Sequence, residues 1–188
     1  MDHVVLLTDS VGAAELARFL KLHRPGLTVL RVATRSALDG VPGKVLPRAR
    51  LIGFATDVIV PAALLERLGY GAYNFHPGPP AYPGWAPHYF AHRDRARWFG
   101  ATAHRMVAAV DFGPIIGTQM FPVPPALTES ELARRGAIAM IHLFRRLGRA
   151  LATAPEPLPT VSARWSGPVR TRRDVIADEL RQTRAKAG

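Results

Sequence analysis

Short apolar runs alternate with segments that carry helix signals along most of the chain, and this alternation limits the possible folds more than any other feature. The runs are rich in Val, Ile and Leu, as strands buried on both faces usually are. Strands separated by helices favour an open, mostly parallel, Rossmann-like α/β sheet with flanking helices. The expected strands are Val4–Leu7, Leu27–Val32, Leu51–Ala55, Tyr70–Phe75, Ala101–Val107 and Ile115–Val123.

Helix signals fill the intervals between these runs. Thr128-Glu129-Ser130-Glu131 is a capping-box signature and predicts the longest helix, which ends near Leu151. Its expected apolar stripe consists of Leu132, Ile138, Ile141, Phe144, Leu147 and Leu151. Shorter helices are expected from an Asp9 or Ser10 cap to about Leu22, from Pro61 to Leu68, and over Pro87–His92.

Prolines interrupt the chain after the long helix. The segment Ala154–Pro159 predicts a linker or an extended crossing, and a short basic helix is expected after Thr171. We therefore expect a main domain over residues 1–153 and a C-terminal extension over residues 154–188.

Composition narrows the chemistry further. The 188 residues include no Cys, which excludes disulfides, thiolate metal sites and a cysteine nucleophile. The net charge of +11 comes almost entirely from Arg and favours anionic partners, although a general bias toward Arg would give the same composition. No apolar run approaches the roughly 20 residues of a membrane span, and the N-terminus lacks the basic region of a signal peptide. We expect a cytoplasmic protein without membrane contact; nucleic acid is not expected as a partner, and the oligomeric state is open.

The stretch Gly71–Trp85, GAYNFHPGPPAYPGW, holds the most unusual residues. Asn74 and His76 end a predicted strand on one face of it, at the sheet edge where open α/β sheets bind ligands. His104 lies within the next predicted strand, and Asp111 lies in the turn that follows that strand. An amide that donates to a developing oxyanion, an imidazole that moves protons and a carboxylate suit acyl transfer to a nucleophile that the substrate brings.

These residues resemble the catalytic domain of the folate-dependent formyltransferases. The resemblance rests on Asn74-x-His76-Pro77, Gly84, Thr102-x-His104 and Asp111-x-Gly113-x-Ile115-Ile116, and it covers about residues 50–125 well. It implies the formyltransferase fold with a shortened N-terminal half. It also implies that residues 1–153 form an enzyme domain that transfers a formyl group from 10-formyltetrahydrofolate to a small amine.

The resemblance also implies roles for particular residues. Asn74 would bind the formyl oxygen, His76 would polarise it, and Asp111 would position His76 or a water and help to deprotonate the amine. His104 and Gly84 would support these three residues. The pterin pocket of the family corresponds here to two loops, and the residues expected to bind the cofactor are Phe54, Thr56, Val58, Ile59, Ala109 and Val110.

Several alternatives stay open. Water in place of the amine would make the protein a 10-formyltetrahydrofolate hydrolase, and an inactive folate-binding or nucleic-acid-binding relic of the fold is a further alternative. For the acceptor we expect a sugar nucleotide or another anionic amine rather than a tRNA, because no second domain follows to grip a tRNA. Tyr82, Trp85 and Tyr89 would stack on a ligand or pack over the loop. His88 and His92 have the spacing of helical metal ligands but no matching carboxylate, so we expect no metal site.

Overall fold

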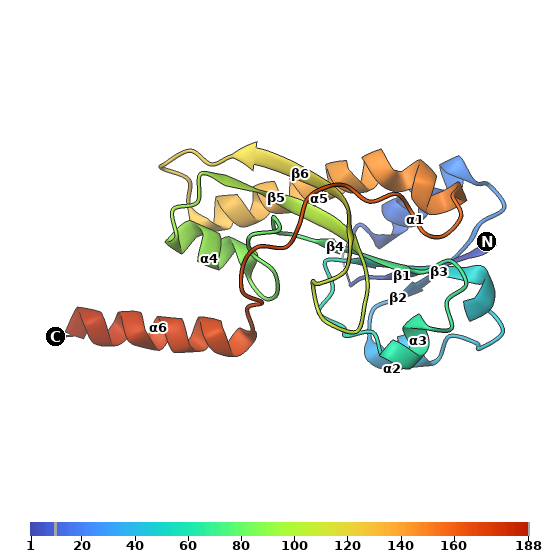
Figure 1. Cartoon of the computed structure of the whole chain (residues 1–188), viewed down its shortest axis with the longest axis horizontal. Helices are drawn as coiled ribbons and strands as arrows, with labels where there is room; N and C mark the ends of the chain where they lie inside the picture. The colour runs from blue at the N-terminus through green and yellow to red at the C-terminus, as the bar shows by residue number, and fades with distance from the viewer. Residues whose placement is uncertain (10, 188) are drawn as a thin grey trace.

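The computed structural model describes residues 1–9 and 11–187, and it is built on one six-stranded sheet (Figure 1). The strand order is β2-β1-β3-β4-β5-β6. The strands from β2 to β4 pair in parallel, and β5 runs antiparallel to both of its neighbours, β4 and β6. This is the predicted fold class, an open and mostly parallel α/β sheet. The strands span β1 His3–Leu7, β2 Thr28–Val32, β3 Ala49–Phe54, β4 Ala72–His76, β5 Trp98–Arg105 and β6 Ile115–Pro122.

Helices cover the sheet on both sides. The helices α1 (Ala13–His23) and α5 (Glu129–Thr153) pack on one face, where alternate residues of the strands form the larger apolar core. The helix α2 (Arg35–Asp39), the 3-10 helix η1 (Leu46–Arg48) and α3 (Ala62–Leu65) border a smaller core on the opposite face. Because strand side chains alternate between faces, Asn74 and His76 point away from the α5 side. No helix among the described residues is long and apolar enough to cross a membrane.

The capping box predicted for α5 is present. The Thr128 side chain accepts from the Glu131 backbone N–H, and the Glu131 carboxylate accepts from the Thr128 N–H. The predicted stripe was wrong at two positions, because Ile138 and Ile141 are 40% and 39% exposed. Small residues occupy part of the contact instead, where Gly136 brings the helix backbone close to the ring of Phe99. The buried face consists of Leu132, Gly136, Ala139, Met140, Leu143, Phe144, Gly148, Leu151 and Ala152.

Local signals were less reliable at shorter helices. The residue before α1 is Gly12, which makes no side-chain cap, so the Asp9 cap was wrong; Ser10 lies outside the described residues. The helix α2 was not predicted, although Thr34 caps it by accepting from the Ala37 N–H at 3.2 Å. The helix α4 spans Pro87–Arg93, close to its predicted limits.

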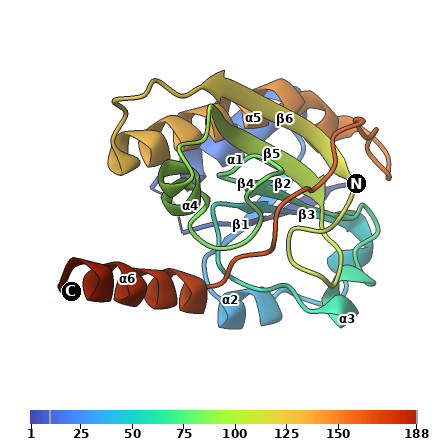
Figure 2. The ribbon, with the colours of Figure 1, turned by 60° about the vertical axis from the view of Figure 1, so that its left-hand side comes forward.

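The chain after α5 crosses the sheet and ends in α6, Arg172–Ala187 (Figures 1 and 2). The helix α6 begins directly after Thr171, as predicted, and Thr171 and Asp174 bond each other's backbone N–H groups there. In both views α6 lies beside α4 and projects away from the sheet. Asp178 joins the two helices by accepting from the Tyr89 hydroxyl and pairing with Arg93. The division into residues 1–153 and an extension stays a prediction.

Candidate active site

Adjacent strands bring the polar residues of the site together. Asn74 of β4 lies directly opposite His104 of the antiparallel strand β5, and His76 lies opposite Thr102. Cross-strand partners point to the same face of a sheet and their side chains lie close together. This register is the reason why the two sequence motifs, about thirty residues apart along the chain, form one cluster.

Asp111 reaches the cluster from the turn that joins β5 to β6. Its φ of 46° is in the left-handed region, where Asp is tolerated better than most residues. Its Oδ2 lies 3.2 Å from His76 Nδ1 and accepts from the Gly84 N–H at 2.8 Å. Its Oδ1 lies 3.0 Å from His104 Nε2. Asp111 therefore stands between both histidines, and each of its oxygens has a partner.

The other ring nitrogens of both histidines also face acceptors. His76 Nε2 is 2.8 Å from the Tyr82 carbonyl oxygen, and His104 Nδ1 is 3.0 Å from the Arg105 carbonyl oxygen. A neutral imidazole carries one N–H, so two neutral rings donate to two of these four acceptors. A proton added to either ring completes a further bond, and the carboxylate of Asp111 offsets its charge. The cluster can therefore take up and release a proton.

Burial and charge act against each other on these groups. Burial lowers the pKa of His76, while the neighbouring Asp111 carboxylate opposes that shift. Burial raises the pKa of Asp111, but the hydrogen bond from His104, the charges of both histidines and the Gly84 N–H outweigh burial and bring it to about 2. Asp111 is therefore ionised at neutral pH, although it is 5% exposed.

The side-chain amide of Asn74 is not fully hydrogen-bonded within the protein. Its Oδ1 is buried and has no hydrogen-bond partner among the described residues. Its neighbour on β3 is Gly53, where a Cβ would lie 2.7 Å from Asn74 Oδ1 and 2.6 Å from Met106 Cε. Buried polar atoms are normally paired, so an unpaired one beside a cleft indicates a position for a ligand.

A cleft of about 80 Å³ opens beside this amide, with Asn74, His104 and Asp111 in its wall. His76 is not in the wall but lies behind Asp111, and it is 4% exposed. Two loops complete the lining, the first after β3 and the second after β5. They contribute Thr56, Val58, Ile59, Val60, Met106, Val107, Ala108, Ala109 and Val110, and Leu65 of α3 completes the wall.

Five of the six residues expected to bind the cofactor therefore line the cleft, and Phe54 does not. Phe54 is 4% exposed and lies on the opposite face of the sheet, in the α5-side core, where its ring packs edge-on against Phe144. The strand alternation explains the difference, because β3 continues through Phe54 and turns its side chain inward.

Trp165 contacts the cluster and was missed by the sequence reasoning. Its Nε1–H donates to the Gly113 carbonyl at 2.9 Å, and its ring lies edge-on to those of His76 and His104. The available signal was a large aromatic residue in a segment that is otherwise polar and rich in prolines. Such a residue usually packs against the body of the protein.

The aromatic residues near Gly84 are held by the protein itself. Arg172 lies over the ring of Trp85 at 4.6 Å, and the Tyr89 hydroxyl donates to Asp178 at 2.7 Å. Tyr82 packs against a small apolar cluster beside α4. Of the two alternatives for these rings, packing therefore has the support of the structure.

The histidines of α4 lie apart from the site. His88 Nε2 is 3.6 Å from Glu129 Oε1 at the start of α5. In the described part of the chain, no group of three or more His, Cys, Asp or Glu side chains is arranged to hold a metal ion.

Known proteins share both the sequence pattern and the fold. The methionyl-tRNA formyltransferase of Dehalococcoides mccartyi is 28% identical over 153 residues, which cover 81% of this chain and 47% of that protein. The chain thus spans about half the length of this relative. A sugar N-formyltransferase from Shewanella sp. FDAARGOS_354 has a similar structure, with a TM-score of 0.76 and 17% identity over 94% of this chain and 79% of its own.

A further solved structure is the formyltransferase PseJ from Anoxybacillus kamchatkensis, with a TM-score of 0.71, 18% identity, and coverage of 93% of this chain and 88% of that one. At such identities these structures support the fold alone. The model of the formyl transferase family matches residues 52–145, half of the chain, which include Asn74, His76, His104 and Asp111. The chain belongs to the formyl transferase family.

Proposed function

We propose that this protein transfers a formyl group from 10-formyltetrahydrofolate to the amine of a small anionic acceptor. One observation carries the proposal: the Asn74 side chain, whose NH2 group can donate, lies in the wall of the same cleft as His104 and Asp111. An amide donor and a group that exchanges protons are what acyl transfer to an amine needs.

The mostly apolar lining of the cleft is compatible with a folate donor. The cleft's volume of about 80 Å³ is well below the roughly 300–1,000 Å³ of most small-molecule pockets, so it would hold only part of the donor. Apolar side chains of the lining extend outward, since Ile59 is 58% exposed and Val110 44%. Exposed apolar residues grouped at one opening favour contact with a flat, partly apolar ligand.

The bond changes define what the residues must do. 10-Formyltetrahydrofolate supplies the formyl carbon as a substrate. The new bond joins that carbon to the acceptor nitrogen, the bond from that carbon to N10 breaks, and the proton lost by the amine ends on N10. The N–H of Asn74 would donate to the formyl oxygen, which gains negative charge as the amine attacks.

The histidine–aspartate cluster would handle the proton. His104 and Asp111 are both in the wall of the cleft, and His104 Nε2 contacts Asp111 Oδ1. A proton accepted there is stabilised by the carboxylate of Asp111 and can return to the leaving nitrogen. His76 is not in the wall of the cleft, and its Nδ1 faces Asp111, so we propose that His76 acts through Asp111 in this arrangement.

A sugar nucleotide is the acceptor class that we favour. PseJ was solved with UDP-4,6-dideoxy-4-formamido-L-AltNAc and tetrahydrofolate, a formylated sugar nucleotide beside a folate. The net charge of +11 is compatible with an acceptor that carries phosphates, because such a surface attracts anions.

A coupled assay tests the proposal. The protein is supplied with 10-formyltetrahydrofolate, with and without a panel of amino-sugar nucleotides, and release of tetrahydrofolate is followed. We expect release that depends on the amine, and loss of that release in Asn74→Ala. Gly26→Ala serves as a matched control, since the new Cβ meets no atom within 4 Å.

The other outcomes separate the alternatives. Release at the full rate without an amine would identify a hydrolase and reject the transferase. Efficient formylation of charged initiator tRNA would reject the sugar-nucleotide acceptor while keeping the donor. No binding of any reduced folate by calorimetry would reject the donor.

A further inference from the structure

The connecting segment, residues 154–171, runs from the end of α5 to α6 and crosses the loops that carry the cluster (Figure 2). Backbone hydrogen bonds hold it against the protein at several points. In one of them the Trp85 N–H donates to the Arg170 carbonyl at 2.7 Å. The segment thereby joins the loop after β4 to the start of β6. Its own backbone N–H groups donate from Val161 to Ile115 at 2.9 Å, from Ser166 to Pro80 at 3.0 Å and from Arg170 to Pro83 at 3.0 Å.

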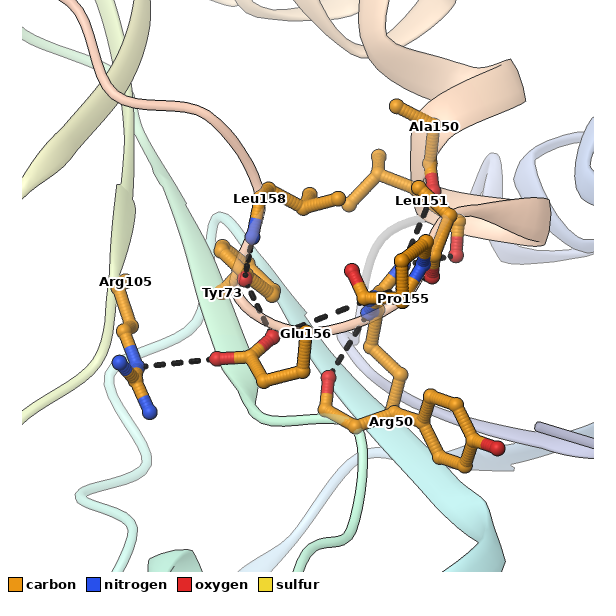
Figure 3. A network of polar contacts seen from close by, with 10 residues as sticks. Arg50, Tyr73, Arg105, Ala150, Leu151, Pro155, Glu156 and Leu158 are labelled. Carbon is orange, nitrogen blue, oxygen red and sulfur yellow. Dashed lines mark hydrogen bonds and ion pairs between the residues drawn. The ribbon is translucent and has the colours of Figure 1, made fainter.

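A buried polar network fixes the first part of this segment (Figure 3). The Tyr73 hydroxyl donates to Glu156 Oε2 at 2.5 Å and accepts from the Leu158 N–H at 2.8 Å. Arg50, which is fully buried, donates to backbone carbonyls at the end of α5 and lies 3.8 Å from Glu156. Burial and the hydrogen bond to Glu156 raise the pKa of Tyr73 to about 12, so its hydroxyl stays protonated and keeps donating at neutral pH.

Trp165 is the side chain that this segment brings to the cluster. It is partly buried, while its neighbours Arg164 and Ser166 are exposed. Its ring centroid lies 5.9 Å from that of His76 and 5.1 Å from that of His104, with interplanar angles of 71° and 86°. Its N–H bonds the backbone two residues after Asp111. One indole thus contacts both histidines and the turn that positions the aspartate.

We propose that Trp165 is a positioning residue, which holds the His76–Asp111–His104 cluster in its working geometry. The inference rests on the proposed function and extends it to the segment outside the region that matches the family. The indole N–H fixes the Gly113 carbonyl and with it the turn that places Asp111. The indole ring covers both imidazoles from outside the wall of the cleft and so keeps water from them.

A pair of substitutions separates the two parts of this role. Trp165→Phe keeps an aromatic ring but removes the N–H, and Trp165→Ala removes both. For Trp165→Phe we expect kcat to fall about fivefold, the effect of one net hydrogen bond. KM for the folate should stay unchanged, because Trp165 does not line the cleft. Trp165→Ala is expected to lose more. Trp98→Phe is the matched control, because Trp98 is 57% exposed at the start of β5.

The pH profile is the readout that packing alone would not move. Asp111 and the other histidine are the charged groups that face each imidazole. When the turn loosens, the carboxylate withdraws and favours the imidazolium less, so the acid limb of kcat/KM should move to lower pH. Equal profiles for wild type and Trp165→Phe, or a loss in KM for the folate alone, would overturn the proposal.

Fluorescence gives a second test that needs no turnover. Imidazolium quenches indole emission by contact. A protein whose only tryptophan is Trp165, Trp85→Phe/Trp98→Phe, should therefore brighten as pH rises and the His76 ring beside the indole loses its proton. The protein that keeps only Trp98 should not. If the protein that keeps only Trp165 shows no such transition, the contact between Trp165 and the histidines is wrong. If the transition disappears when His76→Asn and His104→Asn are added to that protein, the contact is supported. If the wild-type protein shows no turnover, the proposed function is rejected. The fluorescence titration then still tests whether Trp165 contacts the histidines.

Discussion

Replacing Arg50 by Met should destabilise the protein severely, although Arg50 lies far from the cleft. Its guanidinium is fully buried and contacts the carboxylate of Glu156. Met has a similar length but no donor, so the carbonyls at the end of α5 would lose their partner in a site that water does not reach. Five backbone carbonyls accept hydrogen bonds from Arg50. They belong to Tyr70 (2.9 Å), Ala150 (3.0 Å), Leu151 (2.8 Å), Ala154 (3.1 Å) and Pro155 (3.4 Å).

The expected loss is about 3–5 kcal/mol, as when one partner of a buried charge network is removed. A buried acceptor left unpaired costs about 1–3 kcal/mol, and five acceptors would exceed that total. Two effects reduce the sum: burial of the guanidinium is itself unfavourable, as its lowered pKa indicates, and the freed chain relaxes toward water. A loss of this size is a large share of the roughly 5–15 kcal/mol that stabilises a domain.

Urea unfolding at pH 7, with wild type and variant compared at equal m-value, measures this loss. Arg35→Met is the control, because Arg35 is 55% exposed and its pair with Asp39 at 2.9 Å is expected to contribute less than about 1 kcal/mol. Limited proteolysis should also cut Arg50→Met within residues 154–171 sooner than wild type. A loss below about 1 kcal/mol for Arg50→Met, similar to that of the control, would refute the account of this network.

Three further predictions concern the site. Asn74→Ala should lower turnover by about 10²–10³ with little change in unfolding, as for other oxyanion donors, and unchanged rates would move the chemistry elsewhere. Gly53→Ala should fold, because the side-chain ends of Asn74 and Met106 can shift, yet lose at least about tenfold in rate, whereas Gly26→Ala should not. The pKa of Asp111 falls from 3.8 to about 2, so its ionised form stabilises the fold by about 2 kcal/mol above pH 3.8, and this is lost as pH falls toward 2. Asp111→Asn should lack this acid-labile part in pH-dependent unfolding, and parallel curves would contradict it.

Local patterns in the sequence were sufficient for the sheet and for the nearest partners in the site. Strand alternation placed Asn74 and His76 on one face, and the antiparallel register then put His104 opposite Asn74. Apolar runs fix strands well, because a shift by one residue would turn every side chain to the wrong face. The cofactor role that the family resemblance implied for Phe54 failed, because Phe54 belongs to the predicted strand and alternation turns its side chain into the core.

Contacts between distant segments could not be predicted in this way. Arg50 and Glu156, or Trp165 and His76, are separated by about a hundred residues, and no periodicity relates their positions. The stripe of α5 failed for a related reason, since small residues such as Gly136 let the helix approach the sheet on a different side from the one that Ile138 and Ile141 suggest. Tertiary packing decides such positions, and local propensity is a weak guide to them.

The conformation of Asp111 depends both on the strands, which the sequence predicted, and on the contact between Gly84 and Arg170, which it did not. A non-glycine residue at a φ of 46° is strained, and such strain persists only where the surroundings fix it. Here the surroundings are the two histidines on adjacent strands and the N–H of Gly84, whose own φ of 90° lets the backbone of Arg170 approach, since a Cβ there would lie 2.1 Å from the Arg170 oxygen. The carboxylate is thus oriented from one side by the sheet and from the other by a loop that the connecting segment holds. The connecting segment lies outside the residues that match the family, and through this loop we expect it to influence the geometry of Asp111.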